Sequence, residues 1–520
     1  MRLVIPMSGE GKRFVQAGYS GPKPLLIVDG KPMIEHVVDL FPGADSVVFI
    51  ANDKHLSTTN MRDVLLRIRP DCQILEVKVG TKAGPVDVVT EAFDLIDDKE
   101  EVIVSYCDYG TVWSYEKFLK DARESNADGS IACYRGFHPH MLGTDNYAFV
   151  REKGQVLLEI KEKEPFTDDR MSEFASNGTY YFKSGAILKK YFRKMLSSGN
   201  TINGEYYVSL VYNFLVQDSL RVNIFEIEKM LQWGTPYDLE IYKSWSNYFS
   251  NKEKFISKVR NPPGTVTVMP AAGRGSRFSE IGYEVPKPMI QVDGKPMIIS
   301  ATNCLPASDS YVFVCLKDHV DNFEIDDFLK KEYEGCKVIS LSETTSGQAC
   351  TCEIAIENAG IDLDQPILIS ACDNGVVYDS EKYQSLIKDE TNDVIVWSFR
   401  NNQASKRNPN AYAWLDVDEN DLIKHVSCKN FIYDDPLKTH AIIGTMFFRK
   451  ARYFIDGLRR NYESLTTTNG EYYVDDVINQ NITAGLKVKV FESENYICWG
   501  TPDDYRTYQY WKEHFVGEKD

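Results

Sequence analysis

The chain contains the stretch Pro6-Met7-Ser8-Gly9-Glu10-Gly11-Lys12-Arg13-Phe14, and a similar stretch returns as Pro270-Ala271-Ala272-Gly273-Arg274-Gly275-Ser276-Arg277-Phe278. Each belongs to or follows a short apolar run, Leu3 to Met7 in the first case and Val266 to Met269 in the second. A buried strand that enters a glycine-containing turn and then a helix is the usual start of an α/β unit. The sequence therefore predicts the same strand, loop and helix twice.

The repeat extends far beyond these stretches and includes the following pairs: Pro22-Lys23-Pro24 and Pro286-Lys287-Pro288, Asn203 to Val208 and Asn469 to Val474, Trp233 to Pro236 and Trp499 to Pro502. The period is much longer than the roughly 20 to 50 residues of a solenoid repeat, and it suits one α/β domain. We therefore predict two copies of one domain, residues 1–250 and 265–520. The segment 251–264, which contains Pro262-Pro263-Gly264, is the predicted linker.

A second apolar strand in each copy ends at an aspartate. Val102 to Cys107 precedes Asp108, and Ile367 to Cys372 precedes Asp373. Both strands read as buried and parallel. Helical stretches alternate with the strands, for example around Val86 to Ile96, which predicts a Rossmann-like α/β/α domain with a mostly parallel sheet. In such sheets ligands bind at the carboxyl ends of the strands, where the glycine loops and both aspartates fall.

Composition limits the possible functions. Of the 520 residues, 43% are hydrophobic and 26% charged, and no apolar run approaches the roughly 18 residues of a membrane span. The net charge of −17 argues against a general nucleic-acid surface. Eleven cysteines without paired spacing, and a start without the features of a signal peptide, favour free thiols and a cytoplasmic location.

The glycine loop, Arg13 and Lys23 form a pattern that suits phosphate. Glycine lets backbone N–H groups approach a phosphate, arginine binds it in a bidentate manner and lysine adds a point charge. A Gly-x-Gly loop by itself is equally consistent with a plain tight turn. The third glycine of a dinucleotide fingerprint and the Gly-Lys-Ser/Thr of a P-loop are both missing, so the pattern favours another kind of nucleotide chemistry.

These motifs resemble those of the sugar-1-phosphate nucleotidyltransferases, and most closely those of bacterial capsule and surface-polysaccharide enzymes, over nearly the whole of both halves. The resemblance implies that nucleotide phosphates bind to Gly9, Gly11, Arg13 and Lys23 in the first half and to Gly273, Gly275, Arg277 and Lys287 in the second. It also implies that Asp108 and Asp373 are ligands of Mg²⁺. The base-reading segment corresponds to Gly84-Pro85 and to Gly347-Gln348.

The chain departs from this family at the second metal ligand, an aspartate two residues before the glycine of the late Gly-Thr-Pro. Gln232 and Cys498 stand there. Glu228 and Glu494 are candidate substitutes, each within a strand-like stretch and on one face with Glu226 or Glu492 by alternation. The alternative, equally consistent with the sequence, is that both are exposed carboxylates on an edge strand and bind no metal.

On the acceptor side, Glu162-Lys163 and Gly178 resemble the family's residues near the sugar phosphate. The second half has Cys428-Lys429 and Gly444, so the carboxylate is lost there and a different acceptor is expected. Glu205 and Glu471 read as the openings of helices. They are candidates for binding hydroxyl or amino groups, or acidic residues that stabilise a first helical turn.

The sequence thus predicts a tandem nucleotidyltransferase that uses a nucleoside triphosphate, a phosphorylated small molecule and Mg²⁺. Two active halves with different acceptors, or one active half beside a silent structural or nucleotide-sensing half, are both open. A glycosyltransferase is disfavoured because Cys107-Asp108-Tyr109 and Cys372-Asp373-Asn374 lack the Asp-x-Asp motif. The aromatic stretches Tyr237 to Phe249 and Tyr505 to Phe515 predict helices that pack on the domain or form a homo-oligomer contact.

Overall fold

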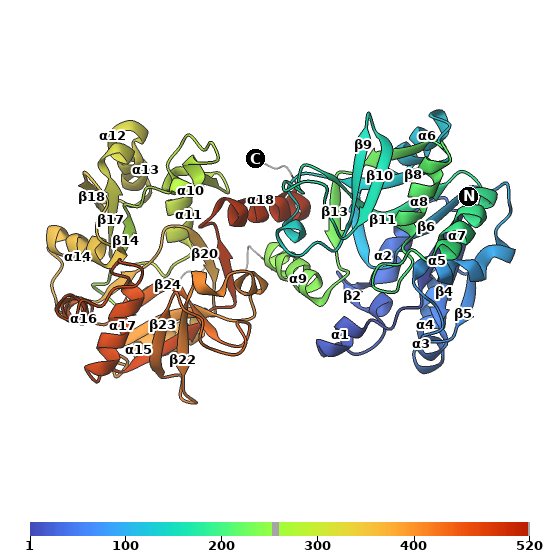
Figure 1. Ribbon diagram of the computed structural model, residues 1–520. Helices are drawn as coiled ribbons and strands as arrows, with labels where there is room; N and C mark the ends of the chain where they lie inside the picture. The colour runs from blue at the N-terminus through green and yellow to red at the C-terminus, as the bar shows by residue number, and fades with distance from the viewer. Residues whose placement is uncertain (252–258, 518–520) are drawn as a thin grey trace. The chain divides into compact units, whose positions relative to one another are not determined.

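The computed structural model describes residues 1–251 and 259–517. The chain divides into two compact units, Met1–Ser246 and Asn247–Asp520 (Figure 1). Part of the predicted linker, residues 252–258, lies outside the described residues. The part that follows packs on the second unit, where Val259 is buried and the side-chain amide of Asn261 donates a hydrogen bond to the carbonyl of Pro306 (3.1 Å).

The first unit contains a nine-stranded mixed sheet in the order β5-β4-β1-β6-β11-β8-β12-β10-β9. Its strands are β1 (Arg2–Met7), β4 (Ser46–Asn52), β5 (Gln73–Val77), β6 (Val102–Ser105), β8 (Gly129–Tyr134), β9 (Ala148–Lys153), β10 (Val156–Glu162), β11 (Phe174–Phe182) and β12 (Val222–Glu226). Strands β5, β4, β1 and β6 run parallel, and β11 lies antiparallel between β6 and β8. Two short ladders join β2 (Ile27–Val28) to β3 (Lys31–Pro32) and β7 (Tyr109–Val112) to β13 (Lys229–Gln232).

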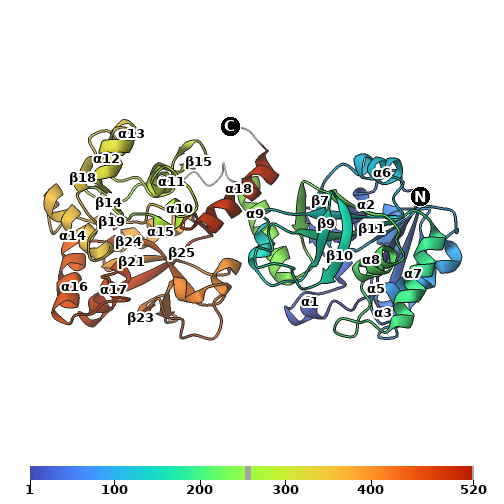
Figure 2. The same cartoon turned by 45° about the horizontal axis from the view of Figure 1, so that its top comes forward.

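Helices cover both faces of this sheet because the strands are apolar on both sides. Val4 of β1 belongs to one core cluster, and its neighbours Leu3 and Ile5 belong to the opposite one. The first cluster includes residues of α5 (Pro85–Val89), α7 (Gly185–Ser198) and α8 (Val208–Gln217), and the second includes residues of α2 (Met33–Asp39), α4 (Met61–Ile68) and α6 (Tyr115–Glu124). The remaining helices of this half are α1 (Lys12–Gln16), α3 (Asp53–Thr58) and α9 (Pro236–Asn251) (Figure 2).

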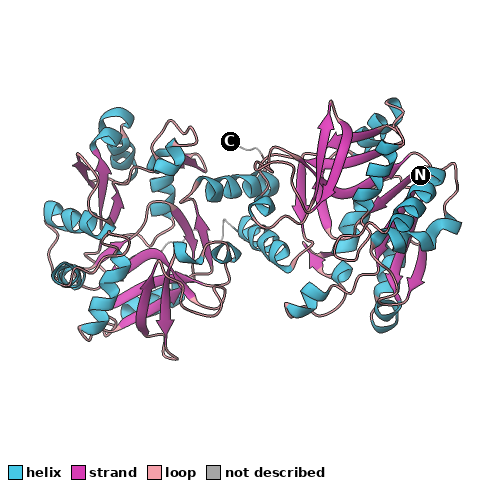
Figure 3. Ribbon diagram, viewed as in Figure 1, coloured by secondary structure: helices cyan, strands magenta, loops and turns pink. Residues whose placement is uncertain are grey.

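The second unit repeats this architecture (Figure 3). Its sheet follows the order β18-β17-β14-β19-β24-β21-β25, with β22 and β23 attached through β24. The strands are β14 (Val266–Ala271), β17 (Ser310–Leu316), β18 (Lys337–Leu341), β19 (Ile367–Ile369), β21 (Val394–Phe399), β22 (Ala413–Val417), β23 (Ile423–Cys428), β24 (His440–Phe448) and β25 (Val488–Glu492). Short ladders join β15 (Gln291–Val292) to β16 (Lys295–Pro296) and β20 (Asn374–Val377) to β26 (Asn495–Cys498).

Helices again flank both faces of the second sheet. One face is covered by α14 (Gln348–Ala359), α16 (Ala451–Glu463) and α17 (Val474–Thr483), and the other by α11 (Met297–Asn303), α13 (Ile325–Glu332) and α15 (Ser380–Lys388). The other helices of this unit are α10 (Ser276–Ser279), α12 (Lys317–Phe323) and α18 (Pro502–Val516). Within residues 1–251 and 259–517, no helix is both long enough and apolar enough to cross a membrane.

The predicted α/β class is confirmed, with two differences in detail. The sheets are mixed rather than mostly parallel, because β11 and β24 are antiparallel to both of their neighbours in the sheet order. The strands before the two aspartates are also shorter than predicted, since β6 ends at Ser105 and β19 at Ile369. The predicted helix around Val86 to Ile96 is present as α5 followed by a 3₁₀ segment, Thr90–Leu95.

Candidate active site

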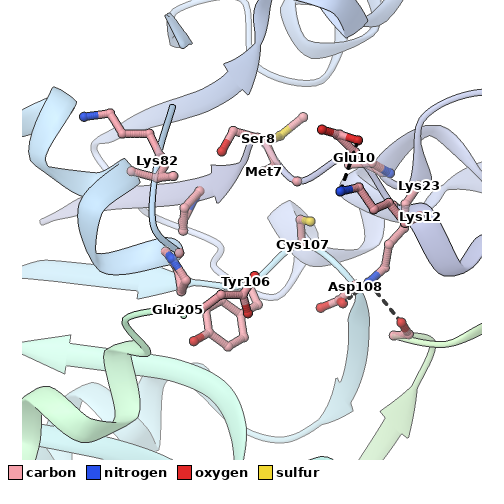
Figure 4. A pocket seen from close by; sticks show the side chains of 18 of the residues that line it. Met7, Ser8, Glu10, Lys12, Lys23, Lys82, Tyr106, Cys107, Asp108 and Glu205 are labelled. Carbon is pink, nitrogen blue, oxygen red and sulfur yellow. Dashed lines mark hydrogen bonds and ion pairs between the residues drawn. The ribbon is translucent and has the colours of Figure 1, made fainter. Parts of the chain in front are cut away.

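A cavity of about 550 Å³ lies in the first unit at the carboxyl ends of β1 and β6 (Figure 4). Its charged lining residues are Glu10, Lys12, Arg13, Lys23, Lys78, Lys82, Asp108 and Glu205. Cations outnumber carboxylates here, although the whole chain carries a net charge of −17. The local charge therefore suits a polyanionic ligand such as a nucleoside triphosphate.

The glycine loop passes directly beside the lysine of the Pro-Lys-Pro segment. Gly11 has a φ of 66°, and a Cβ added there would lie 3.5 Å from the Cβ of Lys23. Gly275 has a φ of 63°, and its added Cβ would come to 2.8 Å from the Cβ of Lys287. Glycine accepts this backbone conformation without strain and leaves room for the lysine, so the spacing of the motif follows from the close approach of two segments.

Lys23 brings together three segments that are distant in the sequence. Its ammonium group forms an ion pair with the carboxylate of Asp108 and donates a hydrogen bond to the carbonyl of Gly234 (3.1 Å). The two side chains of the ion pair are 15% and 26% exposed, so both remain accessible from the cavity. The Pro-Lys-Pro segment, the end of a central strand and the Trp-Gly-Thr-Pro motif thus meet at one point, as Figure 4 shows for Lys23 and Asp108.

The same contact is present in the second unit, between Lys287 and Asp373. Burial disfavours the charge of the Lys287 ammonium, but the Asp373 carboxylate outweighs this effect and the pKa of Lys287 is raised. A smaller cavity, of about 190 Å³, is lined here by Gly273, Gly275, Lys287, Gln348 and Asp373 among others. Arg13 lines the first cavity, whereas Arg277 is not part of the lining of the smaller second cavity.

The metal ligands predicted from the sequence are only partly brought together. Asp108 and Asp373 lie at the sites, but β13 pairs with β7 so that Gln232 is opposite Tyr109, whereas Glu228 lies beyond the far end of the ladder. Four residues of strand separate the two positions, about 13 Å. Glu228 and Glu494 are exposed and absent from the cavity linings, so this structure does not place them with the aspartates.

One carboxylate per site still suits Mg²⁺, which is commonly held by one or two carboxylates together with substrate phosphates and water. Among the described residues, no group of three or more His, Cys, Asp and Glu side chains could enclose a metal ion. Asp108 and Asp373 each face a cavity large enough for phosphate groups. The donor set therefore fits an ion that arrives with the nucleotide.

The predicted base-reading glycines lie against another motif that both halves contain, Asn-Gly-Glu-Tyr-Tyr-Val. In the second unit, Tyr472 donates a backbone hydrogen bond to Ser346 (3.0 Å) and accepts one from Ala349 (3.0 Å). Gly347 lies between these bonds with a φ of 142°, and a Cβ added there would come to 2.4 Å from the carbonyl oxygen of Tyr472. The first unit has the same arrangement around Gly84. Gln348 begins α14 and lines the second cavity.

The Asn-Gly-Glu-Tyr-Tyr-Val motif contributes two residues to the wall of the first cavity. Lys163 donates a hydrogen bond to the hydroxyl of Tyr207 (2.8 Å), and Tyr207 donates one to Glu205 (2.6 Å). Glu205 and Tyr207 both line the first cavity. The expectation that Glu205 and Glu471 open helices is wrong: α8 and α17 begin three residues later, and both glutamates lie in turns closed by backbone bonds to Ile202 and Thr468.

Glu162 is the last residue of β10, and its carboxylate accepts a hydrogen bond from the hydroxyl of Ser209 (2.6 Å). Gly178 and Gly444 lie within β11 and β24. In the second unit, Cys428 faces Asp475 across 3.9 Å. The strand position of Glu162 carries no carboxylate in the second unit, but Asp475 places one beside Lys429 from a different element.

Sequence reasoning missed several residues of the first cavity, including Lys12, Lys82, Tyr106 and Tyr207. Tyr207 belongs to the repeated motif, so the repetition itself was a usable signal. Lys82 had no such signal, because Thr345 precedes Gly347 where Lys82 precedes Gly84. Lys82 forms ion pairs with Asp87 (3.4 Å) and Glu91 (2.5 Å), which hold it at the rim of the cavity.

Similar structures include a nucleoside-diphosphate-sugar pyrophosphorylase from Vibrio cholerae RC9 (23% identity, TM-score 0.39, covering 46% of this chain and 98% of that one). Others are a UDP-glucose pyrophosphorylase from Acinetobacter baumannii (19%, TM-score 0.37, 49% and 94%) and an inositol-1-phosphate CTP transferase from T. maritima (15%, TM-score 0.36, 46% and 93%). Residues 3–165, which include the glycine loop, Lys23 and Asp108, match the family model described as the MobA-like NTP transferase domain.

Proposed function

We propose that this chain is a nucleotidyltransferase that joins a nucleoside triphosphate to a phosphorylated sugar or polyol and releases pyrophosphate, at one site in each unit. The observation that carries the proposal is the meeting of a glycine loop, a lysine and a strand-end aspartate, which is built twice. The NTP transferase domain in residues 3–165 supports the reaction class for the first unit. The equivalent geometry extends the proposal to the second.

The reaction needs little covalent chemistry from the protein. An oxygen of the acceptor phosphate attacks the α-phosphorus of the triphosphate, the bond from that phosphorus to the bridging oxygen breaks, and pyrophosphate leaves with the electron pair. The attacking oxygen is already ionised, so no general base is required. Positioning and charge compensation between two polyanions are the main tasks.

The residues of each site divide these tasks. Lys23 and Lys287 bind phosphate oxygens, and the arginines and backbone N–H groups of the glycine loops bind the remaining phosphate charge. When the nucleotide binds, Lys23 exchanges the Asp108 carboxylate for a phosphate oxygen, which leaves Asp108 for the metal. Asp108 and Asp373 would hold Mg²⁺, which offsets charge on the phosphates and the leaving pyrophosphate when it is bound.

The product would be an activated precursor for a capsule or surface glycan, which is the role suggested by the resemblance of the motifs to those of polysaccharide enzymes. We place the reaction in the cytoplasm. All eleven cysteines are free thiols in the structure, which suits a reducing compartment.

A pyrophosphate-release assay tests the proposal with the full-length protein. UTP, CTP, dTTP and GTP would each be combined with glucose-1-phosphate and inositol-1-phosphate in the presence of Mg²⁺. We expect turnover with at least one pair, and loss of that turnover in the double variant Lys23→Ala/Lys287→Ala. Triphosphate binding without pyrophosphate release from any pair would favour a nucleotide-sensing protein instead.

One observation favours a variant of this function in which only the first unit is active. The second cavity is smaller, about 190 Å³ against about 550 Å³, and Ser276 and Thr345 stand where the first unit has Lys12 and Lys82. Fewer cations weaken the binding of a triphosphate. Under this alternative, Lys287→Ala alone would leave all turnover unchanged.

A further inference from the structure

Each unit has a partly buried carboxylate near its lysine-tyrosine pair, and the two carboxylates come from different elements. In the first unit Glu162, at the end of β10, accepts a hydrogen bond from Ser209 of α8 (2.6 Å). In the second unit Cys428, at the end of β23, faces Asp475 of α17 with 3.9 Å between Sγ and Oδ2. The acidic residue is thus on the strand in the first unit and on the helix in the second. Its small neutral partner is on the helix in the first unit and on the strand in the second.

The contact between strand and helix is otherwise the same in both units, so these positions are structurally equivalent. In the first unit the side-chain amide of Asn213 accepts from the N–H of Ile160 (3.0 Å) and donates to its carbonyl (2.8 Å). In the second, Asn479 forms both bonds with Val426, each at 2.8 Å. Glu162 follows Ile160 by two residues as Cys428 follows Val426, and Ser209 precedes Asn213 by four as Asp475 precedes Asn479.

The surroundings of the two carboxylates are also alike. Each lies near the lysine that follows the strand, Lys163 or Lys429, and both lysines have a positive φ, 62° and 53°. These lysines lie over the rings of Tyr207 and Tyr473, at 4.8 and 5.6 Å from the ring centres. In the first unit Tyr207 lines the cavity and accepts a hydrogen bond from Lys163 (2.8 Å), so these two residues connect the neighbourhood of Glu162 to the space that a ligand would occupy.

Burial works against the charge of both acids. It raises the pKa of Glu162 to about 7 and the pKa of Asp475 to about 6, in spite of the neighbouring lysines. Among the described residues, Ser209 is the one hydrogen-bond donor to the Glu162 carboxylate, and a thiol is the one donor to Asp475. A carboxylate accepts more hydrogen bonds than this, so each has oxygen lone pairs left for a ligand.

We propose that Asp475 is the acceptor-binding carboxylate of the second site and replaces, from α17, the carboxylate that Glu162 provides from β10 in the first. Its ligand would be a hydroxyl group of the phosphorylated acceptor, which donates a hydrogen bond to Oδ1 or Oδ2. This inference rests on the proposed function. Because aspartate is shorter and starts from the opposite wall, the two sites would receive the acceptor hydroxyl at different points, which makes Asp475 a specificity-determining residue.

The test uses the full-length chain with Asp108→Asn, so that pyrophosphate release reports the second site. In this background we would measure kcat/KM for each acceptor of the panel above, and KM for the triphosphate. Asp475→Ser should lower kcat/KM for the acceptor by about tenfold or more, the scale of one lost hydrogen bond to a charged group. The KM for the triphosphate should change by less than about twofold.

The decisive variant is Cys428→Glu/Asp475→Ser, which gives the second unit the arrangement of the first. It should recover most of the acceptor kcat/KM that Asp475→Ser loses, or transfer the preference towards the acceptor of the first site. Asp476→Asn is the matched control, because Asp476 is the next residue of α17 and its carboxylate accepts from Thr468 (2.9 Å). That variant should keep the acceptor kcat/KM. Asp475→Asn, which preserves the shape of the side chain, serves if the serine variant does not fold.

Three results separate the possible failures. If the Asp108→Asn parent releases pyrophosphate and Asp475→Ser retains the parent's acceptor kcat/KM, Asp475 does not bind the acceptor and only this inference is overturned. The same holds if the double variant is no better than Asp475→Ser. If the parent shows no turnover with any pair, the proposed function of the second site fails, and this inference fails with it.

Discussion

The ammonium group of Lys287 lies against the carboxylate of Asp373, which follows the short central strand β19. Both side chains are largely buried, at 19% and 28% exposure. Each charge therefore compensates the other. Under the proposed function, a triphosphate with Mg²⁺ would give both groups a new partner, so neither charge would be left unpaired.

Replacement of Lys287 tests its role in phosphate binding. In the Asp108→Asn background, Lys287→Ala should lower the turnover of the second site about 10²-fold or more, because one electrostatic contact to the developing pyrophosphate charge is lost. Arg277→Ala should have an effect of the same order. The matched control is Lys295→Ala, since Lys295 is half exposed and pairs with Glu332 (2.6 Å) away from the cavity. Unchanged kinetics in Lys287→Ala would remove this lysine from the site.

Gly347→Ala should destabilise the second unit by about 2 kcal/mol or more, because the new Cβ meets the backbone of Tyr472 in a conformation that alanine rarely adopts. The midpoint of thermal unfolding would fall by several degrees. Gly273→Ala is the control for stability, since a Cβ there meets nothing within 4 Å. Equal midpoints for the two variants would show that the contact between Gly347 and Tyr472 can relax at little cost.

Glu162 should make the first unit less stable as the pH rises. Burial raises its pKa from the ordinary 4.5 to about 7, so between these values the folded state holds a proton that the unfolded state has released. The contribution of Glu162 to the free energy of unfolding is then highest below about pH 4.5 and falls until the pH passes about 7. The midpoint temperature of thermal unfolding should accordingly decrease less between pH 5 and pH 8 in Glu162→Gln than in the wild type. Glu159→Gln, which alters an exposed ion pair with Arg151 on the same strand, should behave like the wild type.

The repetition of the sequence was enough to predict the α/β class and the elements around the glycine loops. The strand-end position of Asp108, the Pro-Lys-Pro segment and the family resemblance also pointed to Asp108 and Lys23, which the fold brings into contact although 85 positions separate them. Periodicity does not reveal where a helix begins, so Glu205 was assigned to α8 although a closed turn precedes that helix. Strand alternation likewise could not show that Glu228 lies beyond the ladder that carries Gln232.

The carboxylates of Glu162 and Asp475 show what a residue-by-residue alignment of the two halves misses. An alignment of the two halves pairs Glu162 with Cys428 and reports a missing acid. Only the packing of α17 on β23 reveals that the carboxylate is still present. A carboxylate can thus be present at an equivalent place in both units although the residues at both contributing positions differ.

The sites of Asp108 and Asp373, the two aspartates at the strand ends, should use different acceptors. Asp108→Asn and Asp373→Asn keep the shape of the side chain but remove the charge that would hold Mg²⁺, so each should stop pyrophosphate release at its own site while triphosphate still binds. The acceptor walls differ, with Glu162 and Ser209 in one unit and Cys428 and Asp475 in the other. In the full-length protein, each single variant should therefore abolish use of a different acceptor, as measured by pyrophosphate release across the panel. Loss of the same acceptor to the same extent in both variants would contradict this, and an inert Asp373→Asn would indicate a silent second unit.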